Sequence, residues 1–329
     1  MMHGGNVWQG GTPEGWLDFS ANLRPEGPPE WVYQAMCAAI KDARYYPDIL
    51  MTQARRGIAQ YAGVPEDCVL PTSGGIAAID AAIRAYTGRV LVSPPTFSEY
   101  ALCARAAGLE VSEEGFDVLR PGDTLFLCNP NNPTGRMLAR DTVLSIHTRA
   151  LSARSRLIVD EAFIDCCPKH SVRDQAALLE GLVVVGSLTK ALCIPGVRLG
   201  YLIARPEVVE EIGLAVPPWS LNAFAGLIAK RLPGHLPELE VDRARNASRR
   251  AKLEAALTAL GASVYPSEAS FLLCDFGKPM GEAVARLKDE DILVRTCTSF
   301  GLPSSFLRLA VKTEAQNARL IEALKGALL

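Results

Sequence analysis

The sequence predicts an α/β fold with a mostly parallel β-sheet. Short apolar runs alternate with helical stretches through the middle of the 329-residue chain. The runs lack the polar alternation of half-exposed strands, which indicates strands covered on both faces, as in parallel sheets enclosed by helices. The expected strands cover residues 89–93, 124–128, 157–160, 183–187 and 199–204.

Two helices are expected ahead of most of these strands. The first opens at Pro28 and Pro29 and runs to about residue 43, and the second begins at Gly74 and Gly75. The predicted inward faces comprise Val32, Met36, Ala39 and Ile40 in the first helix, and Ile76, Ile79, Ala82 and Ile83 in the second.

The pattern changes after Pro233. A long helix is expected at about 236–260, followed by strands near 271–275, 292–295 and 306–311 and a closing helix at 314–328. We therefore predict a large central domain and a smaller domain built jointly by the two chain ends, with an N-terminal arm that covers the substrate. The predicted division is 1–45, 46–235 and 236–329.

Composition narrows the function classes. Hydrophobic residues make up 49% of the chain and charged residues 21%, which is typical of a globular enzyme. The net charge of -2 gives no reason to expect nucleic acid or an anionic membrane as a partner. Nine cysteines without a C-x-x-C spacing indicate neither a disulfide framework nor a metal site, and free thiols fit the cytoplasm. No apolar run approaches ~20 residues, and the N-terminus lacks the layout of a signal peptide.

Lys190 carries the most informative chemistry. Its amine can form an imine, and the hydroxyls of Ser187 and Thr189 and the guanidinium of Arg198 suit a phosphate. A cofactor with an aldehyde at one end and a phosphate at the other needs this combination, and pyridoxal phosphate is such a cofactor. The alternative is a surface lysine, the fate of most lysines.

Two further candidates follow predicted strands. Asp160 can keep a pyridine nitrogen protonated, which strengthens the electron withdrawal of the ring, or it can cap a helix. Asn132, in the N-P-N-N-P-T-G segment at 129–135, can donate to a ring hydroxyl, or the segment can be a plain proline turn. Asp160 precedes Lys190 by one strand–helix–strand unit, so both can face one cleft.

A glycine pair and an aromatic residue complete this set. Gly74 and Gly75 precede a helix whose backbone N–H groups can bind phosphate, although the pair can also be a simple turn. Phe97, in the P-P-T-F-S-E-Y segment at 94–100, can stack on a ring or belong to the core.

Together these motifs resemble the aspartate-aminotransferase-like, fold-type I, pyridoxal phosphate enzymes over essentially the whole chain. The resemblance rests on the ordered segments at 74–75, 94–100, 129–135, 160–163 (D-E-A-F), 187–190 (S-L-T-K) and 196–201 (G-V-R-L-G-Y). It implies a large domain with a mostly parallel seven-stranded sheet between helices, a small α+β domain, and a cytoplasmic homodimer.

The resemblance also implies the role of each residue. Lys190 forms the imine link to the cofactor, Asp160 pairs with the pyridine nitrogen, and Asn132 bonds the phenolic oxygen. Phe97 stacks on the ring, and Tyr46 reaches the cofactor phosphate of the partner subunit. The phosphate is held by Gly74, Gly75, Ser187, Thr189 and Arg198.

Two positions depart from the family pattern. Phe163 stands where many relatives have tyrosine, so one hydrogen bond to the phenolic oxygen is missing. The segment at 72–76, T-S-G-G-I, differs from the more usual Asn-Gly-Ala/Ser pattern of the phosphate loop.

The sequence is similar to two groups within the family, the histidinol-phosphate aminotransferases and the threonine-phosphate decarboxylases of cobalamin synthesis. The segments H-G-G-N at 3–6 and D-F-S-A-N at 18–22 resemble the opening of the decarboxylases. In that context His3, Gly4 and Asn22 contact the substrate, whereas the alternative for His3 and Gly4 is a frayed terminus.

Two arginines flanked by apolar strand residues point to an anionic substrate. Arg308 is expected to bind the substrate carboxylate and Arg295 its phosphate, since a buried arginine is costly without an anion. An ion pair with an internal acid is the alternative.

The reaction depends on which bond at the substrate Cα stands perpendicular to the ring. We predict decarboxylation of L-threonine O-3-phosphate to (R)-1-amino-2-propanol O-2-phosphate. The alternatives are histidinol-phosphate transamination and decarboxylation of serine phosphate, whose missing methyl is worth only ~1–3 kcal/mol of discrimination. A noncatalytic regulator would carry a basic DNA-binding domain ahead of this fold, and the motifs begin almost at residue 1.

Overall fold

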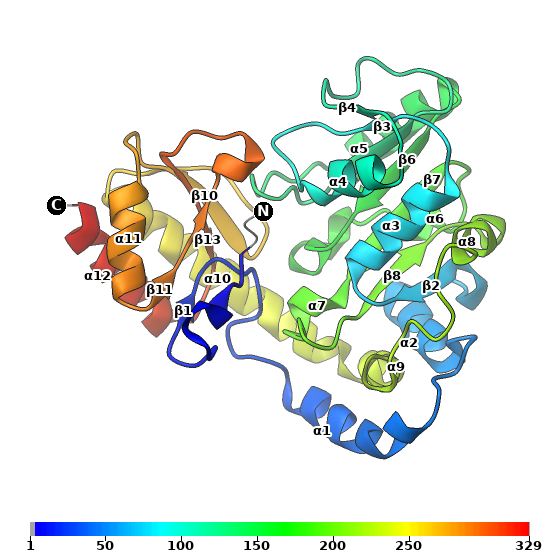
Figure 1. Cartoon of the computed structure of the whole chain (residues 1–329), viewed down its shortest axis with the longest axis horizontal. Helices are drawn as coiled ribbons and strands as arrows, with labels where there is room; N and C mark the ends of the chain where they lie inside the picture. Colours follow the sequence, from blue (N-terminus) through cyan, green and yellow to red (C-terminus); the bar gives the residue numbers. More distant parts are fainter. Residues whose placement is uncertain (1–3, 329) are drawn as a thin grey trace.

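The computed structural model describes residues 4–328 and divides into two lobes (Figure 1). The larger lobe contains a seven-stranded sheet in the order β2-β8-β7-β6-β5-β3-β4. Only β8 runs antiparallel to its neighbours, so the predicted mostly parallel sheet is confirmed. The strands are β2 (Val69–Thr72), β3 (Val90–Leu91), β4 (Val111–Ser112), β5 (Thr124–Cys128), β6 (Arg156–Asp160), β7 (Leu182–Ser187) and β8 (Gly200–Ile203).

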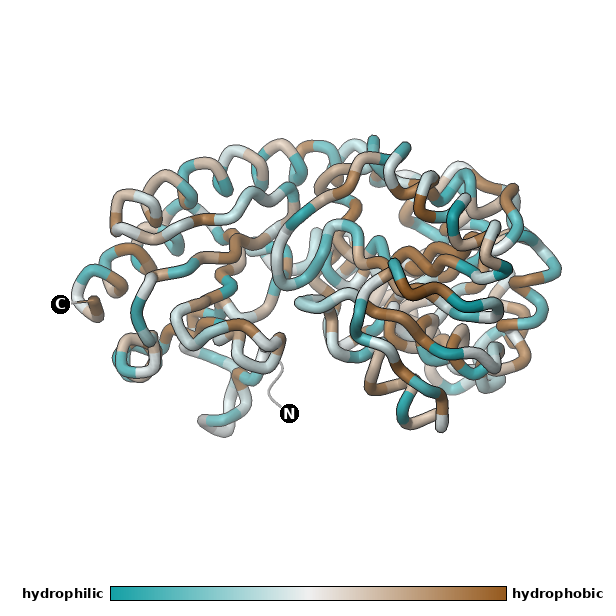
Figure 2. The backbone as a smooth tube through the Cα atoms, turned by 90° about the horizontal axis from the view of Figure 1, so that it is seen from above, coloured by the Kyte–Doolittle hydropathy of each residue, from teal (hydrophilic) through white to brown (hydrophobic). Residues whose placement is uncertain are grey.

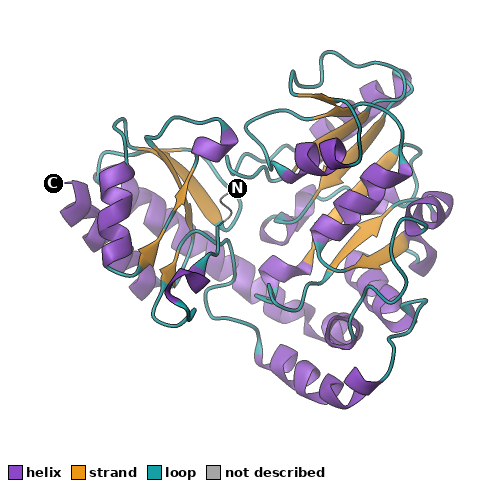
Figure 3. Cartoon of the chain, in the orientation of Figure 1, coloured by secondary structure: helices purple, strands orange, loops and turns teal. Residues whose placement is uncertain are grey.

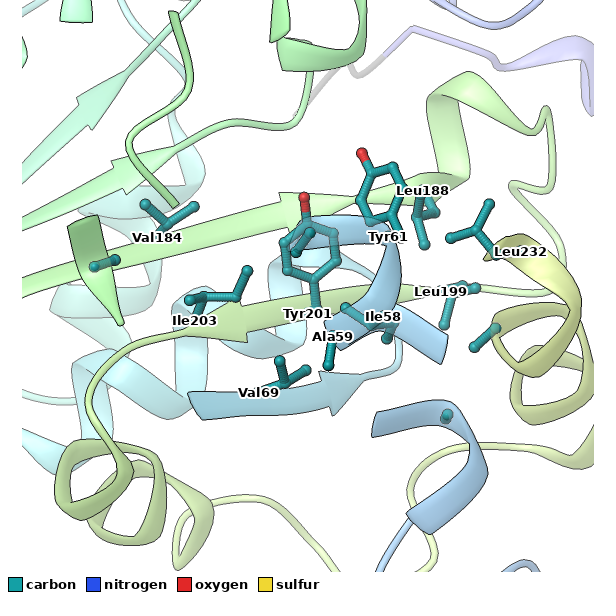
Figure 4. Close-up of a cluster of buried hydrophobic side chains, with 14 of the residues drawn as sticks. Ile58, Ala59, Tyr61, Val69, Val184, Leu188, Leu199, Tyr201, Ile203 and Leu232 are labelled. Atoms are coloured by element: carbon teal, nitrogen blue, oxygen red, sulfur yellow. The ribbon is translucent and has the colours of Figure 1, made fainter. Parts of the chain in front are cut away.

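Helices cover both faces of this sheet (Figure 3). Successive residues of a strand point to opposite faces, so Leu157 and Val159 enter one apolar cluster and Ile158 enters the other. The first face carries α2 (Thr52–Ala62), α5 (Arg140–Ser152), α6 (Arg173–Ala176) and α9 (Ala223–Arg231), and the second carries α3 (Gly75–Ala85), α4 (Glu99–Ala106) and α8 (Pro206–Gly213). Figure 4 shows part of the first cluster, where Tyr201 of β8 lies among side chains from α2 and β7.

The smaller lobe joins the two chain ends. Its antiparallel sheet has the order β12-β13-β10-β9, and β1 of the N-terminal segment pairs with β11. Phe19 is fully buried in the same apolar cluster as Leu307 and Leu320. Its elements are β1 (Leu17–Asp18), β9 (Ser263–Val264), β10 (Phe271–Asp275), β11 (Ile292–Leu293), β12 (Arg295–Thr296), β13 (Phe306–Ala310), α11 (Gly281–Asp289) and α12 (Glu314–Leu328).

The helix α10 (Leu236–Ala259) runs through both lobes (Figure 1). Leu239 near its start packs in a large-lobe cluster, whereas Leu253 and Leu257 pack in the small-lobe core. Figure 2 shows hydrophobic segments in the interior of the larger lobe and a mixed surface along the outer helices. Among residues 4–328, none of the helices combines the length and the apolar character that a membrane crossing requires.

The first helix differs from the prediction in the burial of Ile40 and in the lobe against which it packs. α1 (Glu30–Ala39) buries Trp31, Val32 and Ala35 against the large lobe and contacts α9. Ile40 was predicted to face inward, but it is 62% exposed, because the chain tightens into a 3-10 turn (Ile40–Arg44) and leaves the helical face. We therefore propose a boundary ahead of α1, near residue 29, in place of the predicted division at 45.

Candidate active site

A cavity of about 450 Å³ lies between the lobes and gathers most of the predicted site residues. Its volume is typical of a small-molecule site. The predicted residues that line it are Gly4, Asn22, Gly75, Phe97, Asn132, Asp160, Ser187, Thr189, Lys190, Arg198, Arg295 and Arg308. His3 lies outside the described residues, and Gly74 and Tyr46 are not part of the lining.

The sheet topology explains why distant motifs meet here. β5, β6 and β7 are parallel neighbours, so their carboxyl ends lie along one edge of the sheet. Asp160 is the last residue of β6, and Ser187 is the last residue of β7. Lys190 follows on the short helix α7 (Leu188–Ala191), and Asn132 lies on the loop after β5. The strand ends therefore place an amine, a carboxylate and an amide around one space.

Asp160 is a buried carboxylate with a hydrogen bond to each oxygen. The Tyr100 hydroxyl donates to Oδ2 at 2.6 Å, and the Ala162 backbone N–H donates to Oδ1 at 2.9 Å. Burial raises the pKa of Asp160, while the hydrogen bond from Tyr100 opposes that rise. The arrangement supports a negative charge facing the cavity, which suits a protonated ring nitrogen.

Lys190 lies close to several other cations. Burial, together with the positive charges of Arg308 and Arg198, lowers the pKa of its ammonium to about 8, and the charge of Asp160 opposes this only in part. No ion pair involves Lys190 among the described residues. A lysine with this pKa has a larger neutral fraction near neutral pH than an ordinary lysine, and the neutral amine is the form that imine formation requires.

The glycine pair is fitted to an anion. Gly74 has φ +81°, and a Cβ there would lie 2.8 Å from Nη2 of Arg198. A Cβ on Gly75 would lie 3.3 Å from Cβ of Ser187, and one on Gly200 would lie 2.4 Å from the Gly74 carbonyl carbon. This close packing brings the N-terminus of α3 beside the Ser187 hydroxyl and the Arg198 guanidinium, a phosphate cradle of backbone and side-chain donors.

The two predicted substrate arginines face each other across a strand pair. Arg295 of β12 is the register partner of Arg308 of β13, so both side chains emerge on the same face of the sheet. Both are buried, 7% and 6% exposed. Within residues 4–328 neither is ion-paired with an acid, which removes the alternative of an internal ion pair. Burial and the charge of Arg295 lower the pKa of Arg308 to about 10.

Neutral groups hold these arginines in place. Arg308 donates to the Asn132 side-chain oxygen and, at 2.6 Å, to the Ser20 carbonyl oxygen. Arg295 donates to Ser299 Oγ at 2.7 Å and lies over the Phe300 ring, with 5.0 Å from its Cζ to the centroid. Because the Asn132 oxygen is occupied, its amide nitrogen is the group left to donate into the cavity.

The N-terminal segment closes one side of the cavity. The Gly5 N–H donates to Ser20 Oγ at 2.7 Å, and Ser20 Oγ donates to Asp18 at 2.6 Å. A Cβ on Gly4 would lie 2.1 Å from the Ser20 carbonyl oxygen, so the segment approaches too closely for any other residue. Asn22 is buried, and its Oδ1 has no partner within the described chain, which leaves an acceptor for a ligand.

Several lining residues were not predicted as site residues. Ser20 and Phe300 contact Arg308 and Arg295, and Cys128 ends β5 beside Asp160. Ser20 belonged to the quoted D-F-S-A-N segment, which was the available signal, whereas nothing local marks Phe300 or Cys128. Phe163, which replaces the usual tyrosine, also lines the cavity and packs on Phe271 with ring centroids 5.0 Å apart.

Comparison with known proteins identifies the family. Residues 14–324 match the model of the aminotransferase class I and II family. The chain belongs to this family.

Two activities are represented among similar proteins of known function. The chain is 32% identical to threonine-phosphate decarboxylase of Salmonella typhimurium, over 99% of this chain and 96% of that protein. It is 33% identical to histidinol-phosphate aminotransferase of Symbiobacterium thermophilum, over 95% of this chain and 90% of that protein. A solved histidinol-phosphate aminotransferase from Clostridium acetobutylicum superposes with a TM-score of 0.86 at 26% identity, covering 94% of this chain and 98% of that one.

Class I and II aminotransferase-family enzymes use pyridoxal 5'-phosphate, and the chain is a pyridoxal phosphate-dependent decarboxylase or aminotransferase. The cavity fits the cofactor on three observations. The glycines at 74 and 75 let the N-terminus of α3 lie against Arg198 and Ser187, the Lys190 amine has a lowered pKa, and a hydrogen-bonded carboxylate lines the same space.

Proposed function

We propose that this enzyme decarboxylates L-threonine O-3-phosphate to (R)-1-amino-2-propanol O-2-phosphate and carbon dioxide. The observation that carries the proposal is the pair of buried arginines, Arg295 and Arg308, at one register position of β12 and β13. Two adjacent guanidinium groups without acidic partners suit a small substrate with two anionic groups on neighbouring carbons. Phosphothreonine has that arrangement, with a carboxylate at Cα and a phosphate at Cβ.

The cofactor is proposed to be held by the residues at the strand ends. Lys190 binds it covalently, Asp160 bonds its ring nitrogen, and Asn132 bonds its phenolic oxygen. Phe97 covers one face of the ring. The phosphate lies among Gly74, Gly75, Ser187, Thr189 and Arg198. Bound pyridoxal phosphate supplies an electron sink for the electrons of a bond at the substrate Cα.

The two arginines are proposed to select which bond breaks. Arg308 binds the carboxylate and Arg295 binds the phosphate, so two points of the substrate are fixed and the carboxylate stands perpendicular to the ring. Carbon dioxide leaves and one proton is taken up at Cα, which balances the reaction. The ammonium form of Lys190, whose pKa is about 8, is proposed to deliver that proton and to become the neutral amine. Gly4 and Asn22 border the same space, and we propose that they contact the substrate, together with His3.

A second subunit is proposed to complete the site. Tyr46 is 82% exposed and lies outside the cavity lining of its own chain, with its ring tilted at 40° to that of Trp219 and the centroids 5.0 Å apart. This exposure supports a homodimer in which Tyr46 reaches the cofactor phosphate of the neighbour. The nine cysteines are all free, which supports a reducing, cytoplasmic setting.

The test is carbon dioxide release by the purified full-length enzyme with L-threonine O-3-phosphate. Release with the stoichiometric appearance of aminopropanol phosphate is the expected result. Serine phosphate serves as a second arm, and a rate roughly 10- to 200-fold below that for threonine phosphate is expected because one methyl separates the substrates.

Transamination of histidinol phosphate is the second candidate, favoured by the relative of 33% identity. That reaction needs a keto acid and releases no carbon dioxide. The contradicting outcome is therefore no gas from phosphothreonine, together with conversion of the cofactor to its amine form by glutamate. Histidinol phosphate incubated with 2-oxoglutarate would then be transaminated by the enzyme.

A further inference from the structure

Tyr100 is a fully buried phenol that lies between two of the proposed cofactor contacts. Its side chain is 0% exposed. Its hydroxyl donates to Asp160 Oδ2 at 2.6 Å, and its ring meets Phe97 edge-on, with centroids 5.5 Å apart and planes at 82°. One side chain therefore touches both the carboxylate proposed for the ring nitrogen and the aromatic residue proposed for the ring face.

Packing fixes the position of this phenol. Tyr100 lies in the first turn of α4, and its ring stacks on Phe126 of β5, with centroids 5.0 Å apart and planes at 16°. Phe126 is itself 1% exposed, so the Tyr100 ring has no room to move. Burial also raises the pKa of Tyr100 well above its usual value, so the hydroxyl keeps its proton and stays a donor.

Asp160 depends on this donor for its charge. Its other oxygen accepts only a backbone N–H, from Ala162 at 2.9 Å. Two other titratable groups lie near the carboxylate. Lys190 of α7 stabilises its negative charge, and Cys128 of β5 is a buried thiol whose pKa is raised by burial and by the charge of Asp160. Tyr100 is thus the side chain that donates a hydrogen bond to this carboxylate within the described chain.

We propose that Tyr100 is a positioning residue that orients the Asp160 carboxylate toward the cofactor ring nitrogen and holds Phe97 against the ring face. The proposal rests on the proposed role of Asp160, and it holds whether the enzyme decarboxylates or transaminates. Tyr100 acts through its neighbours and touches no reacting atom, so its effect should appear in cofactor binding before any substrate is added.

The test is Tyr100→Phe in the full-length holoenzyme, with the dissociation constant of pyridoxal phosphate measured by absorbance from pH 5.5 to 9. The variant keeps the ring and loses one hydroxyl. Asp160 then loses a hydrogen bond that favours its ionised form, so its pKa rises. The acid limb of cofactor binding, the pH range in which binding weakens as Asp160 is protonated, should therefore move up by about one pH unit. Binding near pH 6 is expected to weaken about tenfold, with a much smaller loss at pH 8.5.

A matched control separates this role from packing. Tyr86 is another buried tyrosine in the same apolar cluster, and its ring lies under Arg156 and does not line the cavity. Tyr86→Phe should leave cofactor binding unchanged at every pH. If Tyr100→Phe weakens binding equally across the range, or leaves it unchanged, the positioning role is overturned.

A double-variant comparison tests whether Tyr100 acts through Asp160. In an Asp160→Asn background, adding Tyr100→Phe should weaken cofactor binding by no more than about twofold, because the charge that Tyr100 supports is already gone. Full additivity of the two losses would overturn the proposal.

If Tyr100→Phe does not fold, 3-fluorotyrosine at position 100 gives the opposite shift. Fluorine makes the phenol a stronger donor with little change in shape, so the acid limb should move to lower pH. An unmoved limb, or an upward shift, overturns the proposal. Carbon dioxide release is not part of these measurements, so failure of the decarboxylase assignment is recognised separately.

Discussion

The two sides of the active-site cavity are built in different ways. On the large-lobe side, Asp160, Ser187 and Lys190 lie at the ends of neighbouring parallel strands, and each is close in sequence to a strand end. On the small-lobe side, Arg295 and Arg308 meet because β12 and β13 pair in one register. The groups of the large lobe are held at the ends of rigid parallel strands. The two arginines of the small lobe meet only if the register between β12 and β13 is kept. In the proposed function, cofactor chemistry and substrate choice are therefore carried by different parts of the fold.

The largest effect is expected on the large-lobe side, from Lys190→Ala. Loss of the amine removes the covalent link to the cofactor, and activity should fall by roughly 10³-fold or more. Borohydride reduction followed by peptide mass spectrometry should find the cofactor on the peptide with Lys190 in the wild type and on no peptide in the variant. Lys169→Ala, at an exposed lysine, is the control. A reduced adduct on another lysine, with activity retained, would contradict the assignment.

An intermediate effect is expected on the small-lobe side, from Arg295→Leu. Removing a charged hydrogen-bond donor from the phosphate should raise the KM for phosphothreonine about 10- to 100-fold, while the weak reaction with free threonine is unchanged. Steady-state kinetics with both substrates measure the difference. Arg286→Leu on the exposed face of α11 should alter neither value. Equal losses with both substrates would mean that Arg295 supports the lobe and does not bind phosphate.

The smallest effect is expected behind the strand ends, at Glu161. Its carboxyl accepts hydrogen bonds from Ser171 and from the Val172 N–H, and burial raises its pKa from 4.5 to about 7. The folded state therefore binds this proton more tightly than the unfolded state, and the associated stability is lost as pH rises from about 4.5 to 7. In Glu161→Gln the amide oxygen can accept from the Val172 N–H while the amide nitrogen donates to the Ser171 hydroxyl, and the side chain does not ionise. The variant should therefore gain on the wild type by at most about 3 kcal/mol over that interval.

Urea unfolding of the wild type and of Glu161→Gln at pH 5 and pH 8 measures this change. The free energy of unfolding of Glu161→Gln, relative to that of the wild type, should be higher at pH 8 than at pH 5. Glu210→Gln, at an exposed position of α8, should give a difference that does not depend on pH. A Glu161→Gln difference that is the same at both pH values would show that Glu161 is already ionised across the range.

The parts of the fold that the sequence predicted are those with strong local signals. β5, β10 and α12 match their predicted bounds, because an uninterrupted apolar run or helical periodicity defines each of them. β2 and β4 were not predicted. β2 contains Pro71, and β4 stands between Glu110 and Glu113, so neither produces an apolar run, and each forms by pairing with a strand already in the sheet.

The active site shows the same division between local and long-range information. The lysine, the strand-end aspartate and the glycine pair were identified because imine and phosphate chemistry restrict the residue types to short segments. The hydrogen bond from Tyr100 to Asp160 was not predicted. The two residues are 60 positions apart in the sequence, and the bond depends on how α4 packs on β5 and β6.

The sequence by itself determined the chemistry that this protein can perform, because residue type and short-range spacing decide which groups form an imine, bind a phosphate or hold a ring. Only the tertiary structure decided which of those groups meet. Strand order brought Asp160 and Lys190 together, strand register set Arg295 opposite Arg308, and the fold buried both arginines without an acidic partner among the described residues. The physical reason is that pairing and packing are contacts between segments far apart in the chain, which no local pattern encodes.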